Sequence, residues 1–536
     1  MQERIIILGA GTMQGPAIRI ARKLGFFTVV LDGCSSAPCA GMADRFEQID
    51  LKDREGIDAF ARSLYDGPNG LGGIMTAGTD FSATVAWVAE RLGLPGIPYK
   101  AALNASDKGL MRSCFKKAGL PSPEFVTITA SGELDGLSLP APFPLVVKPV
   151  DNMGGRGCRK VNNREEFHEA TTDALRFSRS GRAIVEAFME GPEFSVDAII
   201  YHGEIIICGL ADRHIFFPPF FIEMGHTMPS SITGEQHKAI LKTFRAGVHA
   251  LGLADAKDAG AAKGDIKLTP AGPMIGEIAA RLSGGYMSGW TYPYSSGVEP
   301  IRTAILIAMG HLPENLAPAI TWTSAERAFI SIPGTVKTIE GTDEAQGMPH
   351  VRNLFLRAAE GAKVGFPENN VSKCGNVISA APDRAVAMEA AESAARAILI
   401  RLDPSDAETG AFLRGGEAFP PDAFGLSPEL KALLATLPET FSGTATGDLS
   451  FSLVSFPEFA KSGLKDYLGR GVTECLVAVR KLTGLSLPEI CAETILEHNE
   501  TSDNKHTYLG RSFWAAFVRG SYQGATYYID KLRGEN

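Results

Sequence analysis

The sequence lacks the features that mark several protein classes. Its eight cysteines include no C-x-x-C pair, which argues against a disulfide framework and against a zinc site. No apolar run is long enough to cross a bilayer, so we expect no membrane association. The net charge of −9 over 536 residues argues against a general nucleic-acid binder. Because the chain opens on the strand-like run RIIILGAG and not on a secretory leader, we expect a cytoplasmic protein with reduced thiols.

A chain of 536 residues is too long for one ordinary core, so several domains are expected. In the first hundred residues, strand-like runs (RIIILGAG, FTVVLDG, GGIMTAGTD) alternate with helix-like runs (QGPAIRIARKLG, DREGIDAFARSLYD, SATVAWVAERLG). This rhythm predicts a doubly wound parallel sheet, an α/β fold.

The first strand is followed by a glycine pattern that resembles a dinucleotide fingerprint. Gly9, Gly11 and Gly15 follow the strand, and Asp32 ends the next one. The spacing is G-x-G-x-x-x-G, and a lone glycine fingerprint is a weak signal. We therefore interpret the segment as a tight strand-to-helix turn without dinucleotide binding.

The stretch VVKPVDNMGGRGCRKV is more informative. Lys148 ends an apolar strand-like run, and the loop that follows contains Gly154, Gly155 and Gly157. Glycines let backbone N–H groups approach phosphate oxygens closely, and a lysine adds a point charge. No G-K-[ST] closes the loop, so it is not a P-loop. The pattern predicts a different kind of polyanion site.

Three further features accompany this loop. Lys108 lies in the helix-like SDKGLMRSCFKKAGLP and could neutralise phosphates together with Lys148. AIVEAFMEGPEFSVDAII places Glu186 at a strand end and Glu193 after a Gly-Pro turn, where they could contact an adenine edge and ribose hydroxyls. The fourth feature, KGDIKLTPAGPMIGEIAARLSGGYMSG, carries Asp265 and Glu277 as hard oxygen ligands for Mg²⁺ and Arg281 as a bidentate phosphoryl contact.

The four features in this order resemble the ATP-grasp superfamily, through SDKGLMR, VVKPVDNMGGRG, VEAFMEGPEFSVD and GEIAARLSGG. The resemblance covers about residues 1 to 400, and the arrangement is most similar to the carbamoyl-phosphate-synthetase-like and L-amino-acid-ligase-like branch. It implies ATP and Mg²⁺ (or Mn²⁺) as cofactors. The implied nucleotide contacts are Lys108, Lys148, the lid glycines Gly154, Gly155 and Gly157, the adenine hinge of Glu186, Ala187, Phe188 and Met189, and Glu193 at the ribose. The implied metal ligands are Asp265 and Glu277, and the implied catalytic residues are Arg281 and Lys148.

The sequence departs from the family pattern at the second metal carboxylate. Where the family often has E-x-N, this chain has Ala279, so one oxygen ligand is missing. The form E-x-x-x-R-x-G-G of amino-acid-ligase-like members is present instead. The first carboxylate is the shorter Asp265. These departures leave open whether one or two metal ions bind.

The resemblance and the composition together predict four regions. They are a Rossmann-like pre-ATP-grasp domain at 1–105, a two-lobed α+β ATP-grasp domain at 106–314, a C-terminal lobe of the ligase core at 315–402, and a mainly helical extension of unknown role at 403–536. A loop-like linker is expected after Asp403. The aromatic stripe SFWAAFVRGSYQGATYY is interpreted as a helix packing face.

Substrate residues are harder to identify. Glu223 and His226 lie on an expected loop with many aromatic residues, where substrate contacts are common. The expected partners are a small-molecule carboxylate and an amine, and the sequence leaves open whether the chain forms a homo-oligomer.

The leading hypothesis is an ADP-forming carboxylate–amine ligase that proceeds through an acyl phosphate. One alternative is a carboxyphosphate-forming enzyme of the biotin-carboxylase or carbamoyl-phosphate-synthetase type, although the sequence shows neither a second cassette nor an M-K-M biotinylation motif. Another is a nucleotide-binding regulatory protein with a degenerate site, which only Ala279 favours.

Overall fold

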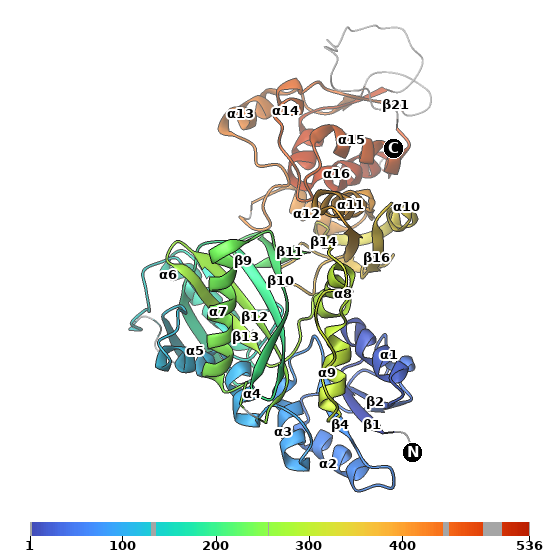
Figure 1. Cartoon of the computed structure of the whole chain (residues 1–536). Coiled ribbons are helices and arrows are strands. Elements are labelled where there is room, and N and C mark those ends of the chain that lie inside the picture. The colour runs from blue at the N-terminus through green and yellow to red at the C-terminus, as the bar shows by residue number, and fades with distance from the viewer. Residues whose placement is uncertain are drawn as a thin grey trace. The chain divides into compact units, whose positions relative to one another are not determined.

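The computed structural model describes residues 3–129, 134, 136–255, 257–416, 418–442, 450–485 and 506–534 (Figure 1). The chain forms two compact units. The first unit comprises Met1–Glu326, Glu368–Asn370 and Ile378–Met388, and the second comprises Arg327–Pro367, Val371–Val377 and Glu389–Asn536. Among the helices in the described ranges, none has the length and apolar character that a bilayer span requires.

The first unit begins with a parallel sheet of four strands in the order β3-β2-β1-β4. Ile5 and Ile7 pack in one hydrophobic cluster, and Ile6 and Leu8 pack in another, so helices cover both faces. The prediction of a doubly wound parallel sheet is confirmed. The elements are β1 (Arg4–Leu8), η1 (Thr12–Gln14), α1 (Gly15–Lys23), β2 (Phe27–Asp32), η2 (Ala40–Met42), β3 (Arg45–Gln48), α2 (Arg54–Tyr65), β4 (Gly73–Thr76), α3 (Ser82–Leu92) and α4 (Tyr99–Ser106).

The glycine turn after β1 is closed by its own residues. The Asp32 carboxylate accepts hydrogen bonds from the backbone N–H of Ala10 at 2.8 Å and of Cys34 at 2.9 Å. Gly9 has φ +97°, and an added Cβ there would lie 3.1 Å from the Gln14 side chain. This geometry is that of a tight strand-to-helix turn, the interpretation drawn from the sequence.

An antiparallel sheet in the order β5-β8-β6-β7 follows. It comprises β5 (Phe125–Thr129), β6 (Leu145–Pro149), β7 (Arg159–Val161) and β8 (Arg182–Ala187), with α5 (Lys108–Lys117) preceding it and α6 (Arg164–Phe177) packed on it. Lys148 lies near the end of β6, and Glu186 lies near the end of β8, as the apolar runs predicted.

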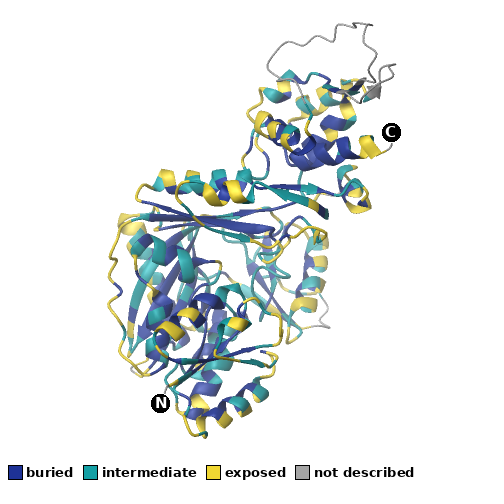
Figure 2. Ribbon diagram, turned by 90° about the vertical axis from the view of Figure 1, so that its right-hand side faces the viewer, coloured by how far each residue is buried: buried dark blue, intermediate teal, exposed yellow. Residues whose placement is uncertain are grey.

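The large sheet of the first unit has the order β13-β12-β9-β10-β11 and continues through the parts of β14 and β18 that belong to this unit. Strands β9 and β11 are mostly buried, whereas β10 and β13 are mostly half-buried (Figure 2). One face packs on α7 through Val196, Ala262, Ile266 and Phe244. The elements are β9 (Glu193–Tyr201), β10 (Glu204–Phe216), β11 (Ile222–Met228), α7 (Gly234–Leu251), β12 (Ala259–Thr269), β13 (Gly272–Ala279), the π-helix η3 (Met287–Thr291), α8 (Tyr292–Ser296), α9 (Pro300–Ala308), β14 (Thr323–Phe329) and β18 (Gly375–Ala381).

The second unit combines a small sheet, in the order β17-β15-β19, with helices. The last helix, α16, is joined to β19, since Tyr522 Oη accepts from the backbone N–H of Ile400 at 3.0 Å and Arg401 forms an ion pair with Asp530. The elements are β15 (Gly334–Glu340), α10 (Thr342–Gly347), β16 (Val351–Leu356), β17 (Lys363–Val364), α11 (Arg384–Ala397), β19 (Leu399–Leu402), α12 (Ala407–Leu413), α13 (Pro428–Thr436), β20 (Phe441–Ser442), β21 (Ser450–Leu453), α14 (Pro457–Ala460), α15 (Val472–Thr483), β22 (His506–Leu509) and α16 (Arg511–Gly534).

The aromatic stripe of α16 is a packing face, as predicted. Phe513, Trp514 and Phe517 are fully buried in one cluster with Phe459. The expectation of a loop-like linker after Asp403 is wrong in one respect, because that stretch contains α12. The Asp406 side chain caps this helix by accepting from Glu408 N, and such a cap favours a helical start.

Candidate active site

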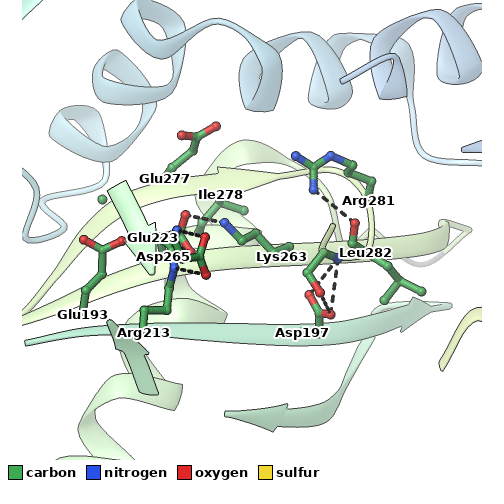
Figure 3. A network of polar contacts seen from close by, with 12 residues as sticks. Glu193, Asp197, Arg213, Glu223, Lys263, Asp265, Glu277, Ile278, Arg281 and Leu282 are labelled. Carbon is green, nitrogen blue, oxygen red and sulfur yellow. Dashed lines mark hydrogen bonds and ion pairs between the residues drawn. The ribbon is translucent and has the colours of Figure 1, made fainter. Parts of the chain in front are cut away.

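The site lies on the face of the large sheet opposite α7. Residues two apart on a strand share a face, so Lys263, Asp265 and Lys267 of β12 lie on one side. On β9, the partners of these three residues in the register are Asp197, Ser195 and Glu193. Figure 3 shows the charged side chains that gather here from β9, β10, β12 and β13. The alternation therefore concentrates ionisable groups on a single surface.

Asp265 and Glu277, the predicted metal ligands, lie directly opposite each other on β12 and β13. Asp265 Oδ1 lies 3.0 Å from the Arg213 guanidinium, and Oδ2 forms an ion pair with Lys263. Burial alone would raise the pKa of Glu277, but the ammonium groups of Lys108, Lys263 and Lys148 outweigh it and lower that pKa to about 2. Glu277 is therefore ionised at neutral pH.

Arg213 of β10 is the residue that sequence reasoning missed. It forms ion pairs with Glu193, with Glu223 at 2.8 Å and with Asp265. Burial by itself would lower the pKa of Arg213, but these carboxylates raise it well above its ordinary value. In the sequence, the only signal was an arginine within an otherwise strand-like run, which does not reveal its partners.

Lys108 stands at the start of α5, where Asp107 caps the helix by accepting from Leu110 N. Its ammonium group donates to the carbonyl of Asn152 at 2.9 Å and lies 3.6 Å from Glu277 Oε1. Burial would lower the pKa of Lys108, yet Glu277 and other nearby carboxylates raise it. The lysine is thus a buried cation held at the glycine loop and beside a predicted metal ligand.

Lys148 and Glu186 form a buried ion pair at 2.7 Å. The other oxygen of Glu186 lies 2.9 Å from Nε of Arg112, which is fully buried and also donates to the carbonyl of Gly276. Burial would raise the pKa of Glu186, but Arg112 and Lys148 lower it. The Glu186 carboxylate therefore anchors Lys148. Arg112 is a second residue that the sequence motifs did not reveal.

The predicted glycine lid has the backbone conformation that glycine favours. Gly154, Gly155 and Gly157 have φ of +69°, +78° and +69°. The carbonyl of Gly154 accepts from Asn370 N at 2.8 Å, and the Asn370 side chain accepts from Glu223 N at the same distance. A segment far along the chain thus joins the lid loop to β11.

The segment Glu186–Met189, predicted to contact adenine through its backbone, differs in part from that expectation. The N–H of Ala187 donates to the carbonyl of Glu124 at 3.0 Å, and that of Phe188 donates to Pro144 at 3.4 Å. These two donors are therefore already used within the protein. The Phe188 ring stacks on Phe221, with Lys160 Nζ 4.2 Å from its centroid.

The expected substrate loop around Glu223 and His226 is wrong, because both residues lie on strand β11, which pairs with β10. His226 is fully buried, with Nε2 2.9 Å from Thr291 Oγ1 and Nδ1 3.2 Å from Glu326. A side chain held in this way has no access to a substrate. Glu223 instead faces Arg213.

Arg281 follows β13 and extends from the sheet on the same side as Glu277 (Figure 3). Its Nη1 donates to the carbonyl of Leu282 at 3.1 Å. The backbone just after Arg281 is fixed by Asp197, whose carboxylate accepts a hydrogen bond from the backbone N–H of Ser283 at 3.1 Å. Burial raises the pKa of Asp197 to about 7, although hydrogen bonds from Ser283 oppose the rise.

Six cations (Lys108, Arg112, Lys148, Arg213, Lys263 and Lys267) and five carboxylates (Glu186, Glu193, Glu223, Asp265 and Glu277) are joined by ion pairs around the site. These cations are the groups that suit a polyanionic ligand. Across the described ranges, no group of three or more His, Cys, Asp or Glu side chains is arranged to hold a metal ion unaided.

Two protein families match the sequence. The family described as "ATP-grasp domain" matches residues 141–288, and "L-amino acid ligase C-terminal domain 2" matches residues 328–403. These matches confirm the resemblance inferred from the motifs, and the first covers the glycine loop, both predicted metal carboxylates and Arg281.

The chain is also similar to curated proteins and to solved structures. The chain is 26% identical over 339 residues to the uncharacterized protein y4rH of Sinorhizobium fredii, covering 62% of this chain and 69% of that one. It is 23% identical over 386 residues to carnosine synthase 1 of Gallus gallus, covering 66% of this chain and 41% of that one. The crystal structure of an L-amino acid ligase from Bacillus licheniformis superimposes with a TM-score of 0.65 at 21% identity, covering 75% of this chain and 99% of that one. The last likeness establishes a shared fold.

Proposed function

Because the chain carries an ATP-grasp domain followed by an L-amino acid ligase C-terminal domain, we propose that it is an ATP-dependent carboxylate–amine ligase. It would convert a small carboxylate and an amine into an amide and release ADP and phosphate. The observation that carries the proposal is the pairing of Asp265 with Glu277 across β12 and β13, with Lys108 and Arg281 beside Glu277.

The glycine loop and its lysines fit a triphosphate. An added Cβ at Gly155 would meet no atom closer than 3.8 Å, so the backbone there is open to close approach. Lys108 and Lys148 are already desolvated and ordered by Asn152 and Glu186. Preorganised cations need little rearrangement when charge develops on a phosphate.

Asp265 and Glu277 fit a divalent cation bound to phosphates. Both are hard oxygen donors, and Mg²⁺ is often held by one or two carboxylates plus substrate phosphates and waters. Ala279 supplies no third oxygen donor, so the remaining ligands of the cation would be phosphate oxygens and waters. When bound, Mg²⁺ or Mn²⁺ would neutralise charge on the phosphate oxygens.

The proposed reaction has two steps. An oxygen of the substrate carboxylate attacks the γ-phosphorus of ATP, and the bond from that phosphorus to the β–γ bridging oxygen breaks, which leaves ADP and an acyl phosphate. The amine then attacks the acyl carbon, loses a proton and expels phosphate. Lys148 and Arg281 would stabilise charge on the transferred group, and the glycine loop would exclude water.

This reaction requires no nucleophilic side chain of the protein. The carboxyphosphate alternative uses the same groups and differs only in the acid that is phosphorylated. Bicarbonate-dependent ADP formation without an organic carboxylate would favour that alternative over the ligase.

The test is to identify the nucleotide product by chromatography while carboxylate and amine pairs are screened. We expect ADP and phosphate to form only when both substrates and Mg²⁺ are present. The Arg281→Lys variant should be strongly impaired, because a lysine cannot reproduce the bidentate guanidinium fork. AMP and pyrophosphate as the main products would overturn the assignment.

A further inference from the structure

The tip of the lid loop, which joins β6 to β7, is held by a residue from a distant part of the chain. The carbonyl of Gly154 accepts a hydrogen bond from the backbone N–H of Asn370 at 2.8 Å. A Cβ added at Gly155 would lie 3.8 Å from Asn369 Cα and from the side-chain nitrogen of Asn370. Asn370 belongs to the first unit, but it lies within residues 328–403, outside the ATP-grasp match.

The base of the lid loop is fixed separately. The Asp151 carboxylate accepts from the backbone N–H groups of Arg179 at 3.0 Å and Ser180 at 2.8 Å. The side chain of Asn152 donates to the carbonyl of Phe177 at 2.7 Å. These bonds come from the segment that follows α6, so the distant segment acts on the tip of the loop and not on its base.

Asn370 is itself anchored through its side chain. Its Oδ1 accepts from the backbone N–H of Glu223 at 2.8 Å. The Glu223 carboxylate forms an ion pair with Arg213 at 2.8 Å, and Arg213 lies 3.0 Å from Asp265 (Figure 3). A continuous series of polar contacts therefore connects the Gly154 carbonyl to a predicted metal ligand.

A bond to the Gly154 carbonyl also orients the N–H of the next residue. The peptide group between Gly154 and Gly155 is trans and planar, so its C=O and N–H point in opposite directions. Because Asn370 binds the C=O, the Gly155 N–H is directed away from Asn370. Glycines have many accessible backbone conformations, so a hydrogen bond from outside the loop selects one orientation of this peptide.

We propose that Asn370 is a positioning residue for the nucleotide, holding the Gly154–Gly155 peptide so that the Gly155 N–H is preset to donate to a phosphate oxygen. The inference rests on the proposed ligase function and adds a residue from outside the ATP-grasp match to the groups that prepare the site for ATP. Asn370 acts through the loop and does not itself contact the nucleotide. A donor that is already oriented loses less conformational freedom when the ligand binds.

The first test measures nucleotide binding to the full chain by isothermal titration calorimetry. The probes are AMP-PNP, a non-hydrolysable ATP analogue, with Mg²⁺, and adenosine, which has no phosphate. In Asn370→Ala the segment loses its bond to the Glu223 N–H. We expect the Kd of AMP-PNP to rise about tenfold, as for the loss of one hydrogen bond to a charged group. The Kd of adenosine should stay the same.

The second test measures the loop directly, through trypsin cleavage after Arg156. Without nucleotide, Asn370→Ala should be cut there several-fold faster than the wild type, because its loop tip opens more often. Asn370→Asp keeps a side-chain oxygen that accepts from the Glu223 N–H, so it should be cut at the wild-type rate. Asn315→Ala is the matched control, since Asn315 Oδ1 also accepts from a backbone N–H, that of Ala317 at 2.9 Å, in the segment after α9. It should change neither the Kd nor the cleavage rate.

The possible failures are distinguishable. An unchanged Kd of AMP-PNP in folded Asn370→Ala, or an equal weakening of AMP-PNP and adenosine, would overturn the role of Asn370 and leave the ligase standing. If Asn370→Ala does not fold, Asn370→Ser, whose side chain is one bond shorter than that of asparagine, takes its place. Failure of the wild type to bind AMP-PNP would overturn the ligase proposal and, with it, this inference.

Discussion

Replacing Arg112 with methionine tests whether the buried charges at β8 form one interdependent set. Arg112 is fully buried, and its Nε lies 2.9 Å from Glu186, which is 2% exposed. In Arg112→Met, Glu186 keeps only Lys148, and the Gly276 carbonyl loses its donor. Removing one partner of a buried ion pair costs about 3–5 kcal/mol when the remaining charge is left uncompensated. Because Lys148 still compensates Glu186 here, we expect a smaller loss of about 1–3 kcal/mol, mainly from the unsatisfied Gly276 carbonyl.

The measurement is urea unfolding of the full chain followed by tryptophan fluorescence. Three of the four tryptophans, Trp87, Trp290 and Trp322, lie in the first unit, so the signal reports mainly on it. The double variant Arg112→Met/Lys148→Met leaves Glu186 without either of its cations. It should lose at least about 1 kcal/mol more than the two single variants lose together, since contacting residues couple by about 0.5–3 kcal/mol. A loss below about 1 kcal/mol in Arg112→Met, or strictly additive losses in the double variant, would refute the reasoning.

Three further predictions concern the site. Gly155→Val should raise the KM for ATP and also lower Tm, because valine is strained at φ +78° even where the space is open. Gly70→Val, with φ +64° and no atom within 4 Å of the added Cβ, should lower Tm through the same strain but leave the KM unchanged; equal KM values in both variants would contradict the lid assignment. Glu277→Gln should lower kcat on the order of 100-fold in a steady-state assay of ADP release, since a proposed metal ligand is lost, and unimpaired turnover would contradict this. The folded-state pKa of Asp197 is raised to about 7, so the stability from this group is present at low pH and is lost as pH rises from its ordinary value near 3.8 through 7. Thermal melts should therefore show that the Tm of Asp197→Asn rises relative to the Tm of the wild type as the pH increases from 5 to 8. A Tm difference that stays constant over this pH range would contradict the raised pKa of Asp197.

Local patterns in the sequence determined much of this protein. Alternating strand and helix runs predicted the parallel sheet, and a lysine at the end of an apolar run predicted Lys148 at the end of β6. The strand-like pieces around Asp265 and Glu277 are strands β12 and β13. These predictions succeed because side-chain period, glycine backbone freedom and the cost of a charge in an apolar run are properties of short segments.

The tertiary structure decided which charges meet. Arg213 gathers Glu193, Glu223 and Asp265 only because β10 pairs with β9, which in turn pairs with β12. His226 was expected on a loop with many aromatic residues, yet pairing with β10 makes the segment a buried strand. Strand register and burial depend on contacts between residues far apart in sequence, and a shift of one residue would move each of these side chains to the other face of the sheet. For that reason the sequence could identify the chemical groups of the site but not the partners that hold them in place.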